Sequence, residues 1–269
     1  TGRKLVERWR IALRYYNLCM TISAFRLDAQ RAIPLETDAT SPDELTRQLP
    51  RGLYTTFSTN HNGTRVLGLT AHLDRLYVPA QDVSPSASRA DLRRALAKLA
   101  LDSAPGESRF RLLRSATDGT VYVIVQPFTP LAKEIYERGV KVITADLIRH
   151  DPRRKDSGFI TESQSARTKV GGDVFEILLT CNGKIYEGMT SNFYVILPVP
   201  QDSSCVVSRR NKFRGTLVTS RTGILLGVTR RAVLRLARGQ GMSIHYRAPR
   251  VASREEFAEA FLTSSSRGI

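Results

Sequence analysis

The sequence contains few cysteines and no long apolar run. Its three cysteines, Cys19, Cys181 and Cys205, are widely spaced and odd in number, so the sequence predicts neither a disulfide framework nor a zinc site. This cysteine usage favours an intracellular compartment, without separating cytoplasm from organelle. No stretch of about 18 apolar residues occurs, so the sequence predicts no membrane-spanning helix.

Acidic residues are scarce relative to basic ones. The 269 residues include 25 Asp and Glu against 41 Lys and Arg, a formal net charge of +16. The imbalance is greatest between Asp202 and Glu255, where no acidic residue occurs and basic residues run from Arg209 to Arg254. A basic stretch can mark a nucleic-acid-binding protein, but this one lacks the interleaved aromatics of a single-strand stacking platform. We therefore interpret it as a solvated basic surface and expect no nucleic-acid partner.

The frequent catalytic motifs are absent as well. The sequence has no GxSxG elbow, P-loop, GxGxxG loop or HExxH helix, and its four histidines lack ligand spacing. The sequence therefore carries none of these local catalytic signatures, and we expect no metal site.

Helix caps and turn signals indicate the fold class. The residues from Ser41 to Glu44 predict an N-cap, a first-turn proline and a capping-box glutamate, and a second capped helix runs from Ser88 to about 101. A turn at 62–63 joins predicted strands at 52–58 and 65–69, and Asn182-Gly183 joins strands at 174–180 and 184–186. A helix is expected over 228–238. Hairpins in both halves, with helices between them, predict an α+β fold.

Two prolines mark the expected boundary between domains. The segment 127–130 begins and ends with proline and reads as a linker. We expect a small N-terminal domain over 1–126, a linker over 127–135 and a large domain over 136–269. Residues 1–40 are a possible extension, in which 3–17 have the pattern of an amphipathic helix.

One lysine stands in an unusual setting. Lysine contributes only eight of the 41 basic residues, and Lys155 follows Arg153 and Arg154 directly. Neighbouring guanidinium groups that point the same way would lower the pKa of its ammonium, as Schiff-base chemistry requires. On local sequence alone, a solvated basic loop is the better interpretation.

Longer motifs change that balance. Their order along the chain is RGLYT at 51–55, AHLDRLY at 71–77, DVFEILLT at 173–180, NGKIYEGMTSNF at 182–193, ILLGVTR at 224–230 and FLTSSS at 261–266. This series resembles the fold-type IV enzymes that use pyridoxal 5′-phosphate (PLP), the class IV aminotransferases. Members include branched-chain and D-amino-acid aminotransferases and aminodeoxychorismate lyase. The resemblance implies a small N-terminal α/β domain, a larger C-terminal pseudo-barrel domain, PLP as cofactor and a homodimer.

The resemblance also implies roles for individual residues. Lys155 matches the lysine that binds PLP as a Schiff base and shuttles a proton between the substrate Cα and C4′ of the cofactor. Glu187 matches the carboxylate facing the pyridine nitrogen, and Arg75 matches the arginine that pairs with the phosphate. Other expected cofactor contacts are Asn192, Leu225, Val228, Thr229, Ser264 and Ser265. Tyr54 and Arg114 match substrate-pocket positions, although a surface arginine is the simpler interpretation of Arg114.

The sequence departs from the family pattern in two places. Phe159 and Ile160 stand where several members carry a tyrosine near the phenolic oxygen of the cofactor. The strand pair expected to continue from the last motif is missing, so the large domain is expected to be C-terminally incomplete.

Three functions follow as hypotheses. The leading one is transamination between a small amino acid, of branched-chain or D-amino-acid type, and a 2-oxo acid. The second is a β-elimination of the aminodeoxychorismate lyase type that releases pyruvate. The third is a non-catalytic descendant whose basic C-terminal half binds nucleic acid.

Overall fold

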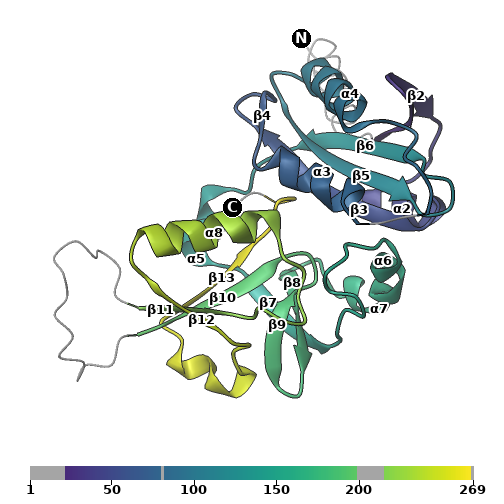
Figure 1. The fold of residues 1–269 in the computed structure, drawn as a ribbon. Coiled ribbons are helices and arrows are strands. Elements are labelled where there is room, and N and C mark those ends of the chain that lie inside the picture. The colour runs from purple at the N-terminus through teal and green to yellow at the C-terminus, as the bar shows by residue number, and fades with distance from the viewer. Residues whose placement is uncertain (1–21, 80–81, 199–214, 268–269) are drawn as a thin grey trace, which may run out of the picture. The chain divides into compact units, whose positions relative to one another are not determined.

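The computed structural model describes residues 22–79, 82–198 and 215–267, which fall into two compact units (Figure 1). Unit 1 comprises the described part of Thr1–Pro130 together with Asp156–Gly158, and unit 2 comprises that of Leu131–Lys155 and Phe159–Ile269. The predicted helix at 3–17, two of the cysteines and the basic residues 209–214 lie outside the described residues. None of the described helices is long and apolar enough to cross a membrane.

Unit 1 is built on a six-stranded antiparallel sheet with the order β2-β1-β6-β5-β3-β4. Its strands are β1 (Ser23–Asp28), β2 (Arg31–Leu35), β3 (Gly52–Asn60), β4 (Arg65–Val66), β5 (Glu107–Ser115) and β6 (Val121–Phe128). The strand predicted over 65–69 ends early. Gly68, with a positive φ of 67°, turns the chain, and helix α3 begins at Leu69.

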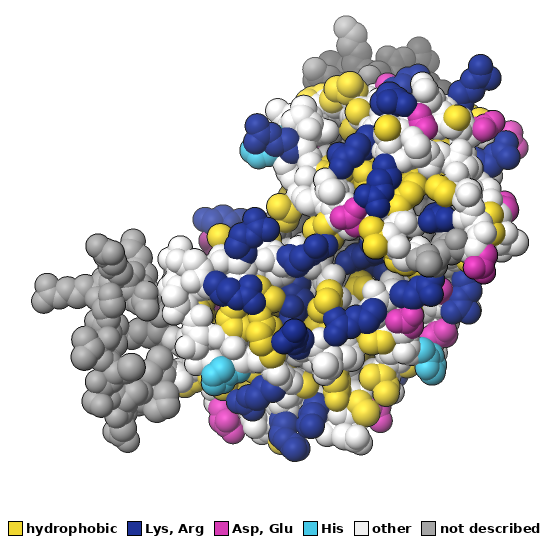
Figure 2. All heavy atoms as spheres, viewed as in Figure 1, with side chains coloured by type: hydrophobic (Ala, Val, Ile, Leu, Met, Phe, Trp, Pro, Cys, Tyr) yellow, Lys and Arg dark blue, Asp and Glu magenta, His cyan; other side chains and the backbone are white. Residues whose placement is uncertain are grey.

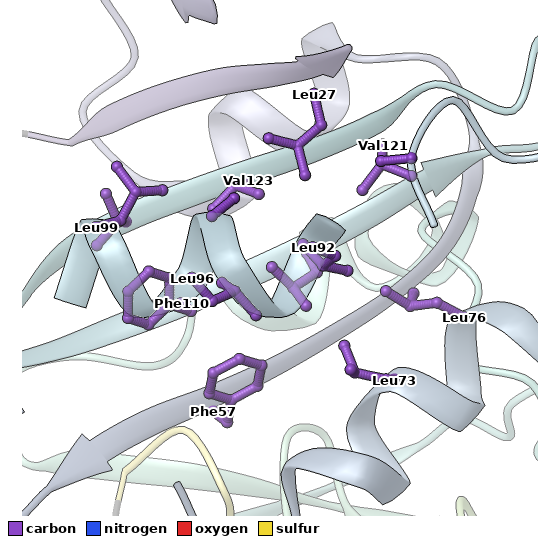
Figure 3. Close-up of a cluster of buried hydrophobic side chains, with 14 of the residues drawn as sticks. Leu27, Phe57, Leu73, Leu76, Leu92, Leu96, Leu99, Phe110, Val121 and Val123 are labelled. Carbon is purple, nitrogen blue, oxygen red and sulfur yellow. The ribbon is translucent and has the colours of Figure 1, made fainter. Parts of the chain in front are cut away.

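Helices cover this sheet through apolar side chains. They are α2 (Pro42–Gln48), α3 (Leu69–Tyr77) and α4 (Arg89–Asp102). Leu73 of α3 and Leu96 of α4 pack in one buried cluster with Phe57 and Phe110 of the sheet (Figure 3). Leu45 of α2 packs with Ile124 in a second cluster, and because neighbouring strand residues alternate in direction, Ile124 points away from the first one.

The helix caps predicted from the sequence are largely present in the structure. Ser88 and Asp91 form a complete capping box at α4. Ser41 caps α2 by accepting from the Glu44 N–H at 3.1 Å. The carboxylate of Glu44 accepts its strongest hydrogen bonds from the backbone N–H and the hydroxyl of Thr40, one residue before the N-cap.

Unit 2 contains two sheets around a shared core. One has the order β7-β8-β9 and the other β12-β11-β10-β13. Their strands are β7 (Lys141–Asp146), β8 (Val174–Cys181), β9 (Lys184–Gly188), β10 (Asn192–Leu197), β11 (Thr216–Thr219), β12 (Ser243–Tyr246) and β13 (Glu259–Thr263). Leu178 and Ile185 of the first sheet cluster with Phe193, Val195 and Val218 of the second. The sheets and helices of the two units together give the mixed architecture that the α+β prediction anticipated.

The helices of unit 2 are α5 (Lys133–Arg138), α6 (Gly158–Glu162), α7 (Gln164–Arg167) and α8 (Val228–Gly239), with a 3-10 helix, η1 (Val251–Glu256). Helix α8 contributes Leu234 and Ala237 to a cluster with Tyr194 and Leu217 of the four-stranded sheet. This packing positions the N-terminus of α8, which follows the loop at 220–227, relative to the strands beneath it (Figure 1).

The β8–β9 hairpin follows its turn sequence. Asn182 and Gly183 have φ angles of 50° and 70°, the left-handed conformation that a two-residue hairpin requires. Along β9 the side chains of Ile185 and Glu187 are buried, whereas Lys184 and Tyr186 are partly exposed. The turn therefore sends a carboxylate toward the buried side of the hairpin.

Candidate active site

Glu187 is the one acid among the predicted site residues, and it is buried. Its side chain is 2% exposed, and Arg149, whose side chain is 6% exposed, forms an ion pair with it at 3.1 Å. The second carboxylate oxygen of Glu187 accepts a hydrogen bond from the Leu225 N–H at 2.9 Å. Arg149 also donates to the Met189 carbonyl and lies 3.7 Å from the centroid of the Phe159 ring. The carboxylate is thus held from two sides.

The electrostatics of Glu187 are a balance of opposing effects. Burial raises the pKa of this carboxyl above its usual value, while the charge of Arg149, the Leu225 N–H and the charge of Lys155 all act to lower it. Arg149 is the largest of the lowering influences. The charged form of Glu187 therefore depends chiefly on one guanidinium.

Leu225 and Asn192 join the strands to the loop before α8. The Leu225 N–H binds Glu187, and its carbonyl accepts from Asn192 Nδ2 at 2.9 Å. Gly227 packs so closely that a Cβ there would stand 2.2 Å from Asn192 Oδ1. The loop backbone is therefore fixed against β9 and β10, directly before the first turn of α8.

The N-terminus of α8 presents the groups that suit a phosphate. Gly227 is its N-cap, no side chain caps the helix, and Val228 and Thr229 occupy its first turn. The first N–H groups of a helix lack intrahelical partners and face the positive end of its dipole. The Thr229 hydroxyl lies 2.8 Å from the Ser265 hydroxyl, so two hydroxyls converge there. Ser264 instead donates to the Thr190 carbonyl and contacts Ser266.

Lys155 lies where the chain passes from unit 2 to unit 1. It is half-buried, and its charge acts on Glu187 as described above. Directly after it, Ser157 exchanges hydrogen bonds of 2.9 and 3.0 Å with Gly52, and Asp156 pairs with Arg51 at 2.8 Å. These bonds anchor the chain on the C-terminal side of the lysine.

Three predicted site residues belong to unit 1. Arg75 is half-buried on α3, and Tyr54 is buried on β3 with the Arg111 guanidinium 5.3 Å from its ring centroid. The surface interpretation of Arg114 is wrong, because this residue is only 4% exposed. Its guanidinium donates to the Leu76 carbonyl at 3.1 Å and to that of Val83, which holds the segment after α3.

Two supporting residues were missed from the sequence. Arg149 stands in an irregular stretch with no motif around it, so nothing local marks it. Glu176 is the one acid in the apolar run of β8, and that contrast was a usable signal. It is 1% exposed and accepts hydrogen bonds from the Thr190 and Ser191 hydroxyls at 2.6 and 3.1 Å. Glu176 thereby fixes the turn between Glu187 and Asn192.

Phe159 stands where several members of the family carry a tyrosine near the phenolic oxygen of the cofactor, and it makes a different contact. Phe159 is 3% exposed, and its ring packs against the Arg149 guanidinium. A guanidinium over an aromatic face gains electrostatic attraction when both are removed from water. Phe159 therefore supports the arginine that pairs with Glu187, and Ile160 is fully buried beside it in the chain.

These groups fit PLP by their chemistry. An amine at Lys155 suits the aldehyde, a buried carboxylate at Glu187 suits a protonated pyridine nitrogen, and hydroxyls of Thr229 and Ser265 at a helix N-terminus suit the phosphate. Each oxygen of Glu187 has accepted one hydrogen bond and can accept another. Among the described residues, no group of three or more His, Cys, Asp or Glu is placed to hold a metal ion.

Solved structures with this fold are numerous. One is a fold IV-transaminase from Curtobacterium pusillum, with 21% identity, TM-score 0.63 and coverage of 92% of this chain and 90% of that one. A second is a hypothetical aminotransferase from Mycobacterium tuberculosis in its PLP-bound form, with 23% identity, TM-score 0.64 and coverage of 91% and 88%. A third is the T.th. branched-chain amino acid aminotransferase complexed with N-(5′-phosphopyridoxyl)-L-glutamate, with 16% identity, TM-score 0.67 and coverage of 91% and 83%. At these sequence identities, the similarity shows that the chain shares the fold of these structures.

The sequence itself establishes the family. No curated protein matches the chain. Residues 52–269, however, match the family described as amino-transferase class IV, which is most of the chain. The chain therefore belongs to the class IV aminotransferases, the PLP-dependent transaminases and their related enzymes.

Proposed function

We propose that this protein transfers an amino group between a small amino acid and a 2-oxo acid, and that Lys155 binds PLP as a Schiff base. The observation that carries the proposal is the Glu187 carboxylate, which is 2% exposed, paired with Arg149 and influenced by the charge of Lys155. A buried carboxylate near an amine suits PLP, which uses a lysine for its Schiff base and a charged partner for its pyridine nitrogen.

Glu187 supplies the charge in this proposal. PLP, when bound, withdraws the electrons of the substrate Cα–H bond, most effectively with a proton on its pyridine nitrogen. A charged Glu187 holds that proton by hydrogen bonding and by Coulomb attraction. Arg149 favours the charged form of Glu187 against the effect of its burial, and Leu225 N–H fixes the direction of the second oxygen.

Lys155 moves the proton. Its amine would be the base that takes the proton from the substrate Cα and returns it at C4′. A general base must lie within hydrogen-bond reach of the proton that it removes. The bonds of Asp156 and Ser157 hold the chain immediately after the lysine, so the backbone of Lys155 is restrained during this transfer.

The phosphate is assigned to the N-terminus of α8. Thr229 and Ser265 would donate their hydroxyls, and the first N–H groups of the helix would complete the cradle. Asn192 orients the loop through Leu225. Arg75 is the proposed counter-charge from unit 1, on the basis of the family resemblance.

The proposed substrate class is supported by one of the similar structures and by the family resemblance. The T.th. structure carries a phosphopyridoxyl adduct of glutamate and is named a branched-chain aminotransferase, which favours an amino acid and a 2-oxo acid. Tyr54 is proposed as a pocket residue by resemblance. The internal hydrogen bonds of Arg114 favour a structural role over a substrate contact. The resemblance also proposes a homodimer, which light scattering of the purified protein tests.

Borohydride reduction followed by peptide mapping tests the anchor. The expected product is a phosphopyridoxyl group on Lys155 alone. Lys155→Arg should lose it, whereas Lys169→Arg, at an exposed lysine, should keep it. An adduct at another lysine would overturn the assignment.

Single-turnover absorbance tests the reaction. Addition of an amino donor should convert the PLP band to that of pyridoxamine phosphate, and a 2-oxo acid should reverse the change. Release of pyruvate without a 2-oxo acid acceptor would instead identify a lyase. Retention of the PLP band with every donor tried would refute transamination.

A further inference from the structure

A groove in unit 2 has no part in the reaction proposed above. It has a volume of about 540 Å³ and runs along α8. Its lining residues are Arg153, Arg221, Leu226, Arg230, Arg231, Leu234, Arg235, Arg238 and Tyr246. Figure 2 shows basic side chains gathered around hydrophobic ones on the face that carries α8. Neither Glu187, Thr229 nor Ser265 lines it, so the groove is separate from the proposed PLP cradle.

The arginines repeat along one side of the helix. Arg231, Arg235 and Arg238 follow each other at helical spacing, and all three are exposed. Like charges at this spacing repel each other and destabilise a helix. Within the described part of the chain, none of the six arginines in the groove forms an ion pair with a carboxylate. The groove therefore carries an uncompensated positive charge.

Arg230 shows that this charge extends beneath the surface. It is only 5% exposed, and its Nε has no hydrogen-bond partner among the described residues. One Nη donates to the Ser220 carbonyl at 2.6 Å. Burial, together with the charges of Arg153 and Arg238, lowers the pKa of Arg230, so its environment disfavours the cation. A buried guanidinium with a free donor is stabilised by an anion that enters the groove.

Tyr246 supplies an aromatic surface in the same groove. The guanidinium groups of Arg221 and Arg230 lie 5.6 and 5.9 Å from its ring centroid, and Arg238 donates to its hydroxyl. Leu226 and Leu234 add apolar contact. The groove thus combines phosphate-type donors with a patch on which a planar ring can rest.

We propose that this groove binds the polyphosphate part of a small phosphorylated molecule. Guanidinium groups bind phosphate oxygens through paired hydrogen bonds and stay charged, and several lie within one small cavity. The volume falls within the range of roughly 300–1,000 Å³ that is usual for small-ligand pockets. A nucleic acid would require a longer track with several stacking aromatics, whereas Tyr246 is the one aromatic residue in the lining.

Calorimetric titration of the 269-residue chain with inorganic tripolyphosphate and with ATP tests the proposal. Wild type should bind both with one ligand per chain, more weakly as salt is added. The groove variant Arg231→Gln/Arg235→Gln/Arg238→Gln should bind at least about tenfold more weakly, because each lost charged hydrogen bond is worth that much. Its melting temperature should change little, since the variant relieves repulsion among exposed arginines and removes one exposed hydrogen bond, that of Arg238 to Tyr246.

A charge-matched variant serves as the control. Arg65→Gln/Arg138→Gln/Arg247→Gln removes three exposed arginines outside the groove and should bind like wild type. Equal weakening in both triple variants would overturn the proposal, because the effect would be one of net charge. Undiminished binding in the groove variant would overturn it too, by placing the anion elsewhere, for example at the PLP cradle.

The ligands separate the remaining cases. Tighter binding of ATP than of tripolyphosphate, reduced by Tyr246→Leu, would support the proposal and place a ring on Tyr246. Equal binding of both would support it with the polyphosphate alone as ligand. A single-stranded oligonucleotide that binds far more tightly than ATP, and through the same arginines, would overturn it in favour of a nucleic-acid surface.

Discussion

Replacement of Arg149 by methionine isolates the electrostatic core of the site. Methionine keeps much of the side-chain volume and removes the charge. Glu187 then stays buried without its largest stabilising partner. Because the two side chains are 6% and 2% exposed, solvent screening does not reduce the effect. Breaking a buried ion pair by removing one partner destabilises a protein by about 3–5 kcal/mol, which for a chain of this size lowers Tm by roughly 6–20 °C.

The pH dependence of this loss has a defined sign. Burial raises the pKa of Glu187 in the folded state, and the loss of Arg149 raises it further. A carboxyl whose folded pKa exceeds its unfolded value binds its proton more tightly in the folded state, so stability falls as pH rises through the interval between the two. The difference in Tm between wild type and Arg149→Met should therefore be greatest at alkaline pH. It should shrink as acidic pH neutralises Glu187.

Thermal unfolding of the apoprotein, followed by circular dichroism across this pH range, measures the effect without linkage to PLP binding. The double variant Arg149→Met/Glu187→Gln should regain most of the lost stability, because it leaves no unpaired charge at the site of this ion pair. Lys141→Met breaks an ion pair whose partners are 57% and 74% exposed, and it should change stability by less than about 1 kcal/mol. A loss in Arg149→Met that is independent of pH and not relieved by Glu187→Gln would refute the reasoning.

Further predictions concern the cradle and the core. Thr229→Val and Ser265→Ala should each weaken PLP binding about tenfold or more, as each removes a hydroxyl from a charged ligand, and equilibrium dialysis that finds unchanged affinity in both would reject the cradle. Gly227→Ala would place a methyl carbon 2.2 Å from Asn192 Oδ1, so PLP occupancy and Tm should both decrease, and wild-type values of both would contradict the close packing. Burial raises the pKa of Tyr194 to about 12, so its hydroxyl should ionise late in an alkaline absorbance titration. The titration curve of Tyr194→Phe should therefore lack only a late ionisation step, and loss of an early step would disprove the burial of Tyr194.

Short sequence patterns predicted elements of this fold because the interactions that form turns and helix caps join residues close together in the chain. Asn182-Gly183 set the hairpin turn, since few other residues accept two positive φ angles. Ser88 and Asp91 set the start of α4, since both hydrogen bonds of the cap lie within one turn. The prediction of a strand over 65–69 was wrong at its end, because Gly68 turns the chain into a helix.

The motifs of the sequence also led to Lys155 and Glu187 as the candidate centre and to the family that the comparison confirmed. The tertiary structure alone decided what surrounds them. Arg149 forms an ion pair with Glu187 although 38 positions separate them in the sequence. The packing of the Phe159 ring against the Arg149 guanidinium is also a contact that no local pattern encodes. The burial of Arg230 likewise depends on which side of α8 packs. Pairing and burial are properties of segments brought together by folding. The sequence by itself therefore determined most of the elements and the class of enzyme, and only the folded chain decided which charges are buried and which of them are paired.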